Sequence, residues 1–539
     1  MSEVLTQMLI PRWFLRFALV AVVCCPIQLN LSAQTEAEVN ASIKKFTQVY
    51  EAVEANFATK VDPDHIVYRG AIPGMLRTLD PHSNFFDPKA YALMREGQAG
   101  HYEGVGMFVG PNEGKIVVIY PFVGSPAFRA GLRPGDQIVS VNDTNTEHST
   151  TTQVSTMLKG PRGTPVTITA KREGNPALLH FSVVRGNVPR GSVNQAFWYR
   201  PGIAYMKIEA FNETTSHEVD QALARFGENE IEGLILDLRD NGGGLVQECV
   251  NIADRFLKKG QLVVSHHGRA SAETKFVAKH GERGREYPIV VLVNRNTASA
   301  SEILSGALQD HDRGWIIGEP TFGKGLVQAP FPLYGNSALL LTIAKYYTPS
   351  GRLIQRDYAN QGLYEYLSRN EGKNNPKDMK KTDSGRIVFG GDGITPDEKY
   401  EVPKLTRFET QLFDSQFTGR SPFFSFVPIY FSTHDTKIAK DWKPNDELMD
   451  TFRAYLAKKG FEFTPGEFDR DRSWIADRLR EEIFITAFSK EDSERMVLEN
   501  DPEIHKGLES LPSSKALLDK AHEVLARQAK KPAAEARQQ

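Results

Sequence analysis

Two serines lie where the sequence predicts the end of a buried strand. Residues 289–293 form an unbroken apolar run, which is typical of a parallel strand buried on both faces. A polar turn at 294–297 follows, and apolar residues then recur on one helical face. The pattern predicts a strand, a turn and a helix, with Ser299 and Ser301 at the helix start. Enzymes of the α/β class place their sites at such strand ends.

Either hydroxyl is a candidate nucleophile for acyl transfer. The first amides of a helix lack internal partners and carry partial positive charge. Acyl transfer needs such donors when a carbonyl becomes an oxyanion, and losing one typically costs about 2.7–4 kcal/mol. Ser299 and Glu302 also match the capping box S-x-x-E. A purely structural role for Ser299, as a helix cap, therefore stays open.

Lys324 is a candidate general base. It is the only cation in the turn 319–325, and Phe322 and Leu326 border it. A lysine held among apolar groups loses proton affinity, because desolvation disfavours the ammonium. Depressing its pKa from about 10.4 to about 7–8 takes roughly 4 kcal/mol and leaves a usable base at neutral pH. Serine with a lysine base is an established alternative to serine with histidine.

The segments TASASEILSGALQD, from Thr297, and GEPTFGKGLVQ, from Gly318, resemble the carboxy-terminal processing (tail-specific) serine proteases. The resemblance implies that Ser299 is the nucleophile and Lys324 the base. It also implies that Glu302 or Gln328 orients the lysine, and the sequence does not decide between them. Because Glu302 fits the capping box equally well, its role stays open.

Three consecutive glycines lie between a predicted strand at 233–238 and a predicted helix at 245–256. Glycines there permit the close approach of a ligand to the backbone. A phosphate loop is disfavoured because no G-K-[ST] follows. The resemblance implies that one of these glycines supplies an oxyanion-hole amide opposite the amide of Ala300. Gly244 is the first candidate and Gly243 the second. The alternative is a plain turn before the helix.

Residues 102–186 change to a pattern of short strands. The run SPAFRAGLRPGD, from Ser125, is similar to a PDZ domain. PDZ domains take a peptide as an added strand and hold its terminal carboxylate on backbone amides. The resemblance implies that Gly104, Val105, Gly106 and Met107 form that carboxylate site.

Strands and helices alternate around the candidate site. Such successive βαβ units predict a parallel sheet. The predicted strands are 203–208, 233–238 and 261–264, the predicted helices are 214–226 and 245–256, and 331–347 is predicted to be a hairpin. The expected fold class is α/β, with a parallel-sheet (ClpP/crotonase-like) serine protease core, an inserted PDZ domain and helical N- and C-terminal regions.

The 539 residues divide on these patterns into five segments. They are a signal peptide (1–33), an N-terminal helical region (34–101), the PDZ domain (102–186), the serine protease core (187–408) and a C-terminal helical extension (409–539). Nothing in the sequence connects the extension to chemistry. We expect His82 to be a loop residue without a role, Cys249 to lie in the core, and the charged segment 358–386 to be a surface loop or insertion.

The amino terminus has the layout of a secretory signal peptide. Arg12 and Arg16 precede the apolar segment 17–25, and small residues at 31–33 offer a cleavage site. About nine apolar residues are fewer than the roughly 20 that span a bilayer. The layout predicts a periplasmic or secreted protein, with an uncleaved membrane anchor as the alternative.

Together these patterns predict an exported serine endopeptidase that acts on unfolded or precursor proteins through their carboxy-termini. No metal or organic cofactor is implied. The formal charge of −2 provides no electrostatic footprint for nucleic acid. An inactive PDZ-type peptide receptor or chaperone is the main alternative. A Ser-His-Asp hydrolase is a further alternative, but the sequence lacks the G-x-S-x-G elbow typical of that class. Inner-membrane association, a homo-oligomer and an adaptor protein are left open.

Overall fold

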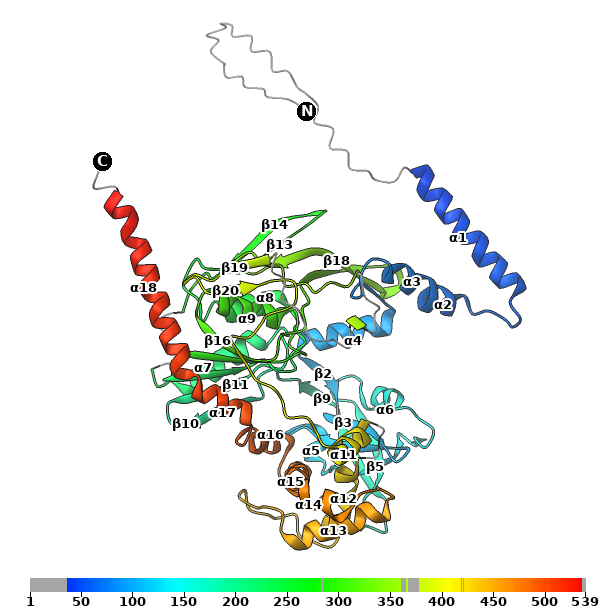
Figure 1. Ribbon diagram of the computed structural model, residues 1–539. Coiled ribbons are helices and arrows are strands. Elements are labelled where there is room, and N and C mark those ends of the chain that lie inside the picture. Colours follow the sequence, from blue (N-terminus) through cyan, green and yellow to red (C-terminus); the bar gives the residue numbers. More distant parts are fainter. Residues whose placement is uncertain are drawn as a thin grey trace, which may run out of the picture. The chain divides into compact units, whose positions relative to one another are not determined.

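The computed structural model describes residues 36–227, 229–282, 285–359, 365–366, 378–417, 419 and 421–535 (Figure 1). The predicted signal peptide lies outside these ranges, so export stays a prediction. The chain divides into two units, Met1–Gly70 and Ala71–Gln539. Within the described ranges, no helix has both the length and the apolar character needed to cross a membrane.

The first unit contains helix α1 (Glu36–Asn56) and the short helix α2 (Pro63–Ile66). A π-helical turn, η1 (Val67–Ala71), leads into the second unit. The apolar residues of α1 recur at the expected helical spacing, and they are exposed to solvent. Val49, for example, is 65% exposed.

The second unit is built on a six-stranded sheet of order β10-β11-β12-β15-β16-β21. Its strands are β10 (Gln195–Arg200), β11 (Ile203–Lys207), β12 (Gly233–Asp237), β15 (Ile289–Val293), β16 (Gly314–Gly318) and β21 (Glu398–Lys399). β10 pairs antiparallel with β11, and every later pair in the order is parallel. The predicted parallel sheet is therefore confirmed.

Helices cover both faces of this sheet, which explains why all residues of β12 and β15 are buried. One face packs on α7 (Thr215–Phe226), α8 (Val246–Ala253) and α9 (Ala300–Asp310). The other packs on α17 (Pro502–Glu509) and the start of α18 (Leu511–Glu535). Alternate residues serve the two faces: Val291 belongs to the first cluster and Val290 to the second. Cys249 is fully buried in the first, as expected.

A second, antiparallel sheet has the order β1-β18-β13-β14, and β17 also pairs with β18. Its strands are β1 (Asn84–Phe86), β13 (Leu262–Gly268), β14 (Ser271–Val277), β17 (Leu326–Pro332) and β18 (Ala338–Tyr347). The predicted hairpin is confirmed as β17 and β18, joined through η2 (Tyr334–Asn336). The assignment of strand 261–264 to the parallel sheet was wrong. That segment is β13, which pairs antiparallel with β14 and β18, because an apolar run does not specify its partner strand.

The PDZ fold is present as a sheet of order β3-β4-β5-β7-β8, in which β3 is an edge strand. Its elements are β3 (Met107–Asn112), β4 (Lys115–Pro121), α5 (Pro126–Arg129), β5 (Gln137–Val141), β6 (Thr144–Asn145), α6 (Thr151–Leu158), β7 (Pro165–Lys171) and β8 (Leu179–Val184). The paired strands β2 (His101–Gly104) and β9 (Gly186–Pro189) bracket the domain. Helices α3 (Ile72–Arg77) and α4 (Pro88–Ala99) precede it.

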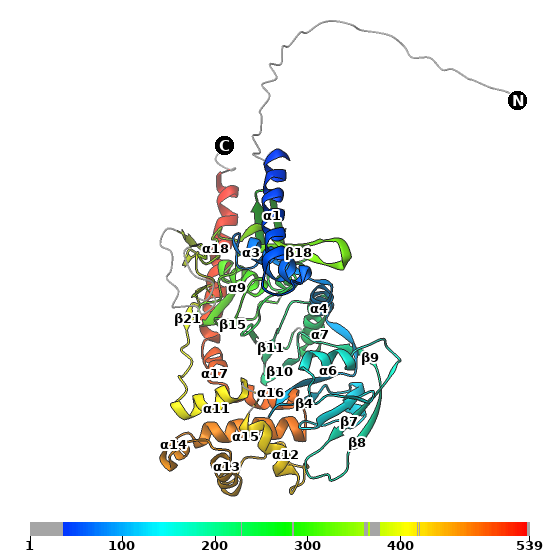
Figure 2. The same ribbon diagram turned by 90° about the vertical axis from the view of Figure 1, so that its right-hand side faces the viewer.

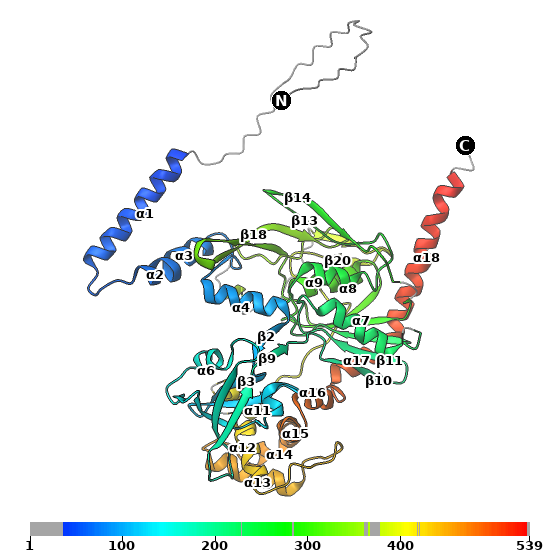
Figure 3. The ribbon, with the colours of Figure 1, turned by 180° about the vertical axis from the view of Figure 1, so that it is seen from behind.

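The C-terminal region is helical, as predicted. Its first helices are α11 (Arg407–Phe417), α12 (Pro422–Phe431), α13 (Asp446–Lys458), α14 (Pro465–Arg470), α15 (Arg472–Ala487) and α16 (Lys490–Leu498). The helices α11 to α15 enclose a core of their own, which includes Phe426, Phe452 and Leu479. They lie beside the PDZ strands in Figures 2 and 3, and a Cβ on Gly135 of the PDZ domain would come within 2.6 Å of Pro428.

Candidate active site

Ser299 occupies the turn between β15 and α9 with strained backbone angles. Its φ of 57° and ψ of −115° are unusual for a residue other than glycine, and such strain costs on the order of 1–3 kcal/mol. Its side chain is half-buried. Ser301 is fully buried, and its hydroxyl donates to the main-chain oxygen of Asn241 at 2.9 Å. Of the two candidate serines, only Ser299 is accessible to a substrate.

The buried carboxylate of Glu302 joins the serine turn to the lysine loop. It accepts hydrogen bonds from the Ser299 N–H (2.7 Å), as the capping-box prediction requires. It also accepts from the Thr321 hydroxyl (2.5 Å) and from the N–H groups of Gly323 (2.7 Å) and Lys324 (2.9 Å). Burial raises the pKa of Glu302, and these hydrogen bonds oppose the rise. Glu302 is thus more than a helix cap, because it fixes the backbone of the candidate base.

Tyr346 makes a second connection between the two segments. Its buried phenol lies 3.1 Å from the carbonyl oxygen of Ser299 and also contacts the carbonyl oxygen of Lys324. Within the described residues, the structure records no hydrogen bond from the Ser299 hydroxyl to the Lys324 amine. Such catalytic contacts are often long without substrate and tighten when it binds.

The amine of Lys324 donates instead to the side-chain oxygen of Gln328, at 2.9 Å. The Gln328 amide nitrogen donates in turn to the carbonyl oxygen of His82 at 2.5 Å, which fixes the orientation of the amide. Burial lowers the pKa of Lys324 below its ordinary value, although Glu302 and Asp80 partly oppose this. Of the two residues that the sequence left open, Gln328 contacts the amine and Glu302 contacts only the main chain of the lysine.

His82 is packed beside the residues that hold the Lys324 amine. Its Nε2 is 2.9 Å from the Tyr366 hydroxyl, and burial, with the nearby Lys324, lowers its pKa to about 4. Asp80 accepts from the main-chain N–H of His82 and so holds this turn. His82 lies in a loop, as expected, but its carbonyl contact with Gln328 was not foreseen.

Tyr366 corrects the prediction of a surface loop at 358–386. Most of that segment lies outside the described residues, but Tyr366 is only 1% exposed. Its ring packs edge-on against Phe322, beside the candidate base. Sequence reasoning missed Tyr366; the only signal was an aromatic residue within a charged, polar segment.

The glycine segment lies directly against the serine turn. Gly243 has a φ of 96°, and a Cβ there would come within 2.8 Å of the Ser299 Cβ and 2.9 Å of the Ala300 nitrogen. Asn241 fixes this approach, because its carbonyl accepts the Ala298 N–H at 3.0 Å. Only glycine fits at position 243.

The amides of the two candidate oxyanion glycines are not equivalent. The N–H of Gly243 donates to the Asn241 side chain at 2.9 Å. Gly244 forms a parallel bridge with Phe211 that uses the carbonyl of Gly243 and the N–H of Leu245. The N–H of Gly244 is therefore directed away from Phe211. Within the described residues, the Gly243 amide is engaged, whereas no hydrogen bond is recorded from the Gly244 amide or from the Ala300 amide at the start of α9.

The four residues predicted to hold a peptide carboxylate form the buried connection from β2 to β3. Gly106 has a φ of 79°, and a Cβ there would come within 2.3 Å of the Ser125 Cβ. The carbonyls of Val105 and Gly106 accept from the Ala127 N–H and the Ser125 hydroxyl of the neighbouring α5 segment. These carbonyls are thus turned inward, and Gly104 and Met107 flank them in the loop.

Tyr102 lies at this loop, and sequence reasoning missed it. Its ring would be 2.9 Å from a Cβ on Gly104, and the Lys159 amine lies over the ring, 5.1 Å from its centroid. Burial raises the pKa of the Tyr102 phenol to about 12, and the charge of Arg190 and the nearby amides of Met107 and Gly106 partly oppose the rise. The phenol thus lies near two of the amides that a carboxylate would need.

Three segments match known protein families. Residues 202–361 match peptidase family S41, residues 118–172 match the PDZ domain, and residues 26–90 match the "Activating protease CtpB N-terminal domain". Ser299, Lys324 and Gln328 all lie in the first of these segments.

Curated relatives cover most of the same region. The chain is 35% identical over 330 residues to a "Carboxy-terminal-processing protease" of Bartonella bacilliformis, covering 60% of this chain and 75% of that protein. It is 32% identical over 328 residues to "Carboxy-terminal processing protease CtpB" of Bacillus subtilis, covering 60% and 68%. A solved "Photosystem II D1 C-terminal processing protease" is 28% identical, with 66% and 86% covered and a TM-score of 0.34.

Proposed function

Because the chain belongs to the carboxy-terminal processing proteases of peptidase family S41, and is thus a serine peptidase, we propose that Ser299 and Lys324 form its catalytic dyad. The observation that carries the proposal is the buried Glu302 carboxylate, which binds the main chain of both residues. Digestion of an unstructured protein by the parent chain and by a Ser299→Ala variant tests it, since only the parent should cleave.

The geometry supports a two-step acyl transfer. The neutral amine of Lys324 takes the hydroxyl proton as the Ser299 oxygen attacks the peptide carbonyl carbon. The N–H groups of Gly244 and Ala300 donate to the resulting oxyanion. Lys324 returns the proton to the leaving amine, and water then hydrolyses the acyl-enzyme. Gln328 holds the lysine side chain while Glu302 holds its backbone.

Substrate capture is assigned to the PDZ domain. The edge strand β3 can take an extended peptide as an added strand, and the loop 104–107 can hold the terminal carboxylate. We propose that the substrates are unfolded or precursor proteins recognised by their carboxy-terminal segment, and that the chain is exported to meet them. In this binding step, the substrate carboxylate displaces the Tyr102 phenol from the loop.

Changing Gln328 to glutamate should shift the pH dependence of cleavage upward. A carboxylate beside the Lys324 amine favours the ammonium and raises its pKa. A rise of one unit leaves about tenfold less neutral amine below that pKa. The pH profile of kcat/KM should therefore rise at a higher pH than in the parent.

Gln328→Leu is the matched control, because it removes the acceptor without adding charge. It should lower the rate without moving the profile to higher pH. An unchanged profile for Gln328→Glu would show that residue 328 does not contact the amine during catalysis.

Changing Tyr102 to phenylalanine should strengthen peptide binding. The variant keeps the ring over Gly104 but removes the oxygen that lies near the loop amides. One hydrogen bond is worth about 1 kcal/mol net, or roughly fivefold in Kd. Fluorescence anisotropy with a labelled peptide measures this, and Tyr199→Phe, on β10, is the control. Weaker binding by Tyr102→Phe would mean that the phenol helps to hold the peptide.

A further inference from the structure

The C-terminal extension forms a wall of the groove along the PDZ edge strand. A cavity of about 580 Å³ is lined by residues 107–112 of β3 and by Thr151 and Ser155 of α6. Ile119 of β4 and residues of the extension also line it; we call Gln416, Gly419, Ser421, Phe424 and Glu482 the extension wall. An edge strand beside a helix is where a PDZ domain adds a peptide strand. The extension wall therefore lies beside any peptide bound there.

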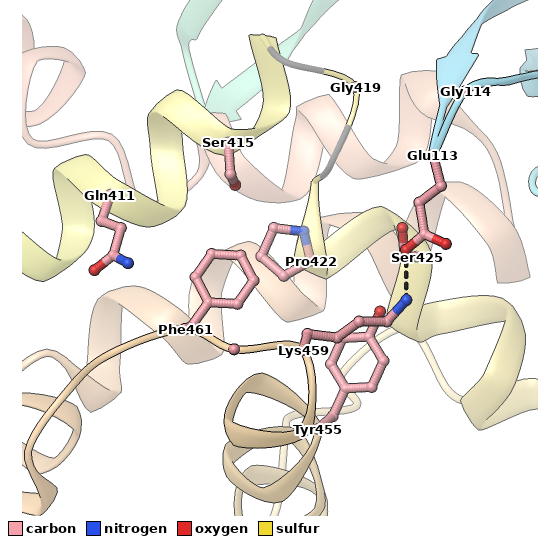
Figure 4. Close-up of a pocket in the computed structure, with 11 residues that line it drawn as sticks. Glu113, Gly114, Gln411, Ser415, Gly419, Pro422, Ser425, Tyr455, Lys459 and Phe461 are labelled. Carbon is pink, nitrogen blue, oxygen red and sulfur yellow. Dashed lines mark hydrogen bonds and ion pairs between the residues drawn. The ribbon is translucent and has the colours of Figure 1, made fainter.

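Polar contacts anchor the extension to the tip of the β3–β4 hairpin. The Glu113 N–H donates to the Gly419 carbonyl at 2.8 Å, and the Ser425 hydroxyl donates to the Asn112 side chain at 3.1 Å. Figure 4 shows Lys459 reaching Glu113, and this ion pair measures 2.5 Å. The hairpin tip is the end of β3 farther from the loop 104–107. A peptide with its carboxylate in that loop would therefore direct its upstream residues toward the extension.

Among the described residues that line this cavity, Glu482 is the only charged one. Its half-buried carboxylate makes no ion pair or hydrogen bond within the described residues. The two described cations that act on this carboxylate are paired with other acids: Arg478 with Glu481 at 2.8 Å, and Lys490 with Glu481 at 3.7 Å and Glu494 at 3.4 Å. Burial, with the nearby Glu481, raises the pKa of Glu482 to about 7.

We propose that the extension wall selects substrates, and that Glu482 favours carboxy-terminal segments with a lysine or arginine a few residues before an apolar end. The inference rests on the proposed function, because its ligand is the segment that the PDZ domain would capture. A half-buried carboxylate without a partner is partly desolvated, and a cation from the ligand supplies its partner. Met107, the 53% exposed Phe108 and Phe424 provide the apolar surface for the rest of the segment.

The test uses the full chain with Ser299→Ala, so that bound peptides are not cleaved. Labelled ten-residue peptides share one apolar carboxy-terminus and differ at a single upstream position, which is lysine, alanine or glutamate. That position is scanned over the six residues that could lie along β3. At the position facing Glu482, fluorescence anisotropy should show the lysine peptide binding about fivefold tighter than the alanine peptide, and the glutamate peptide more weakly.

Adding Glu482→Gln should remove the lysine preference and leave the Kd of the alanine peptide unchanged. Glu509→Gln, which neutralises an exposed carboxylate on α17, is the matched control and should keep the preference. Glu482→Lys should reverse the order, so that the glutamate peptide binds best. A lysine preference that survives Glu482→Gln, or equal binding of all three peptides at every position, would overturn the inference.

Peptides with a carboxamide end separate this inference from the proposed function. If the free acids bind at least tenfold tighter than the amides but show no charge preference, carboxy-terminal capture stands and the role of Glu482 fails. If acids and amides bind equally, or nothing binds, carboxy-terminal capture fails, and the inference fails with it.

Discussion

Replacing Ser299 with alanine is expected to abolish peptide-bond cleavage, lowering kcat by a factor of about 10⁴ to 10⁶. The reason is chemical, because the variant lacks the oxygen that forms the acyl-enzyme. The β3 edge and its loop are remote from residue 299 in sequence and pack around a hydrophobic core of their own, so peptide binding should persist. Gel and mass-spectrometric analysis of an unstructured protein substrate measures the loss. Labelling by a fluorophosphonate should disappear with it.

Ser301→Ala is the matched control for this prediction. It removes a buried hydroxyl that bonds to Asn241, so it should cost about 1 kcal/mol of unfolding free energy and leave cleavage largely intact. Cleavage that survived in Ser299→Ala and vanished in Ser301→Ala would exchange the roles of the two serines. If both variants still cleaved the substrate, neither serine would be the nucleophile.

Replacing Lys324 with methionine is expected to lower kcat/KM by a factor of about 10² to 10⁴, the usual contribution of a general base. Lys324→Arg should be similarly impaired, because a guanidinium keeps its proton at any accessible pH. In the parent, burial lowers the pKa of Lys324, and only the neutral amine accepts the serine proton. The rate should therefore rise with pH through that lowered pKa, below the ordinary value of 10.5.

The measurement is a pH profile of single-turnover cleavage, in which chemistry limits the rate. Lys345→Met, at an exposed lysine of β18, is the control and should keep both the rate and the profile. A rate that did not change between pH 5 and 9 in the parent would exclude a lysine base. A Lys324→Met variant whose rate still rose with pH over the same range would also exclude a lysine base.

Local patterns were sufficient for much of the fold. The apolar run at 289–293 is buried on both faces, and such a run needs no knowledge of distant residues to be recognised as a strand. The capping box at Ser299 and Glu302 is also local, because it spans a single helical turn. The hairpin of β17 and β18 was predicted for the same reason, since its strands are neighbours in sequence.

The sequence did not predict which strands or side chains contact each other when they are far apart along the chain. The strand β13 has an apolar start like those of the parallel strands, yet it pairs in the antiparallel sheet. Tyr366 belongs to a charged segment, yet it is buried and its ring packs against that of His82, which is distant in sequence. The extension had no visible role until the structure placed Glu482 in the groove beside β3.

For the site itself, the sequence alone determined which residue types are present: a serine at a helix start, a lysine between glycines, and glycines after a strand. These are properties of short segments, which local sterics and burial dictate. Only the tertiary structure decided which serine is accessible, that Gln328 holds the Lys324 amine while Glu302 holds its backbone, and which glycine amide is available. Those choices depend on hydrogen-bond directions and packing between segments that meet only when the chain folds.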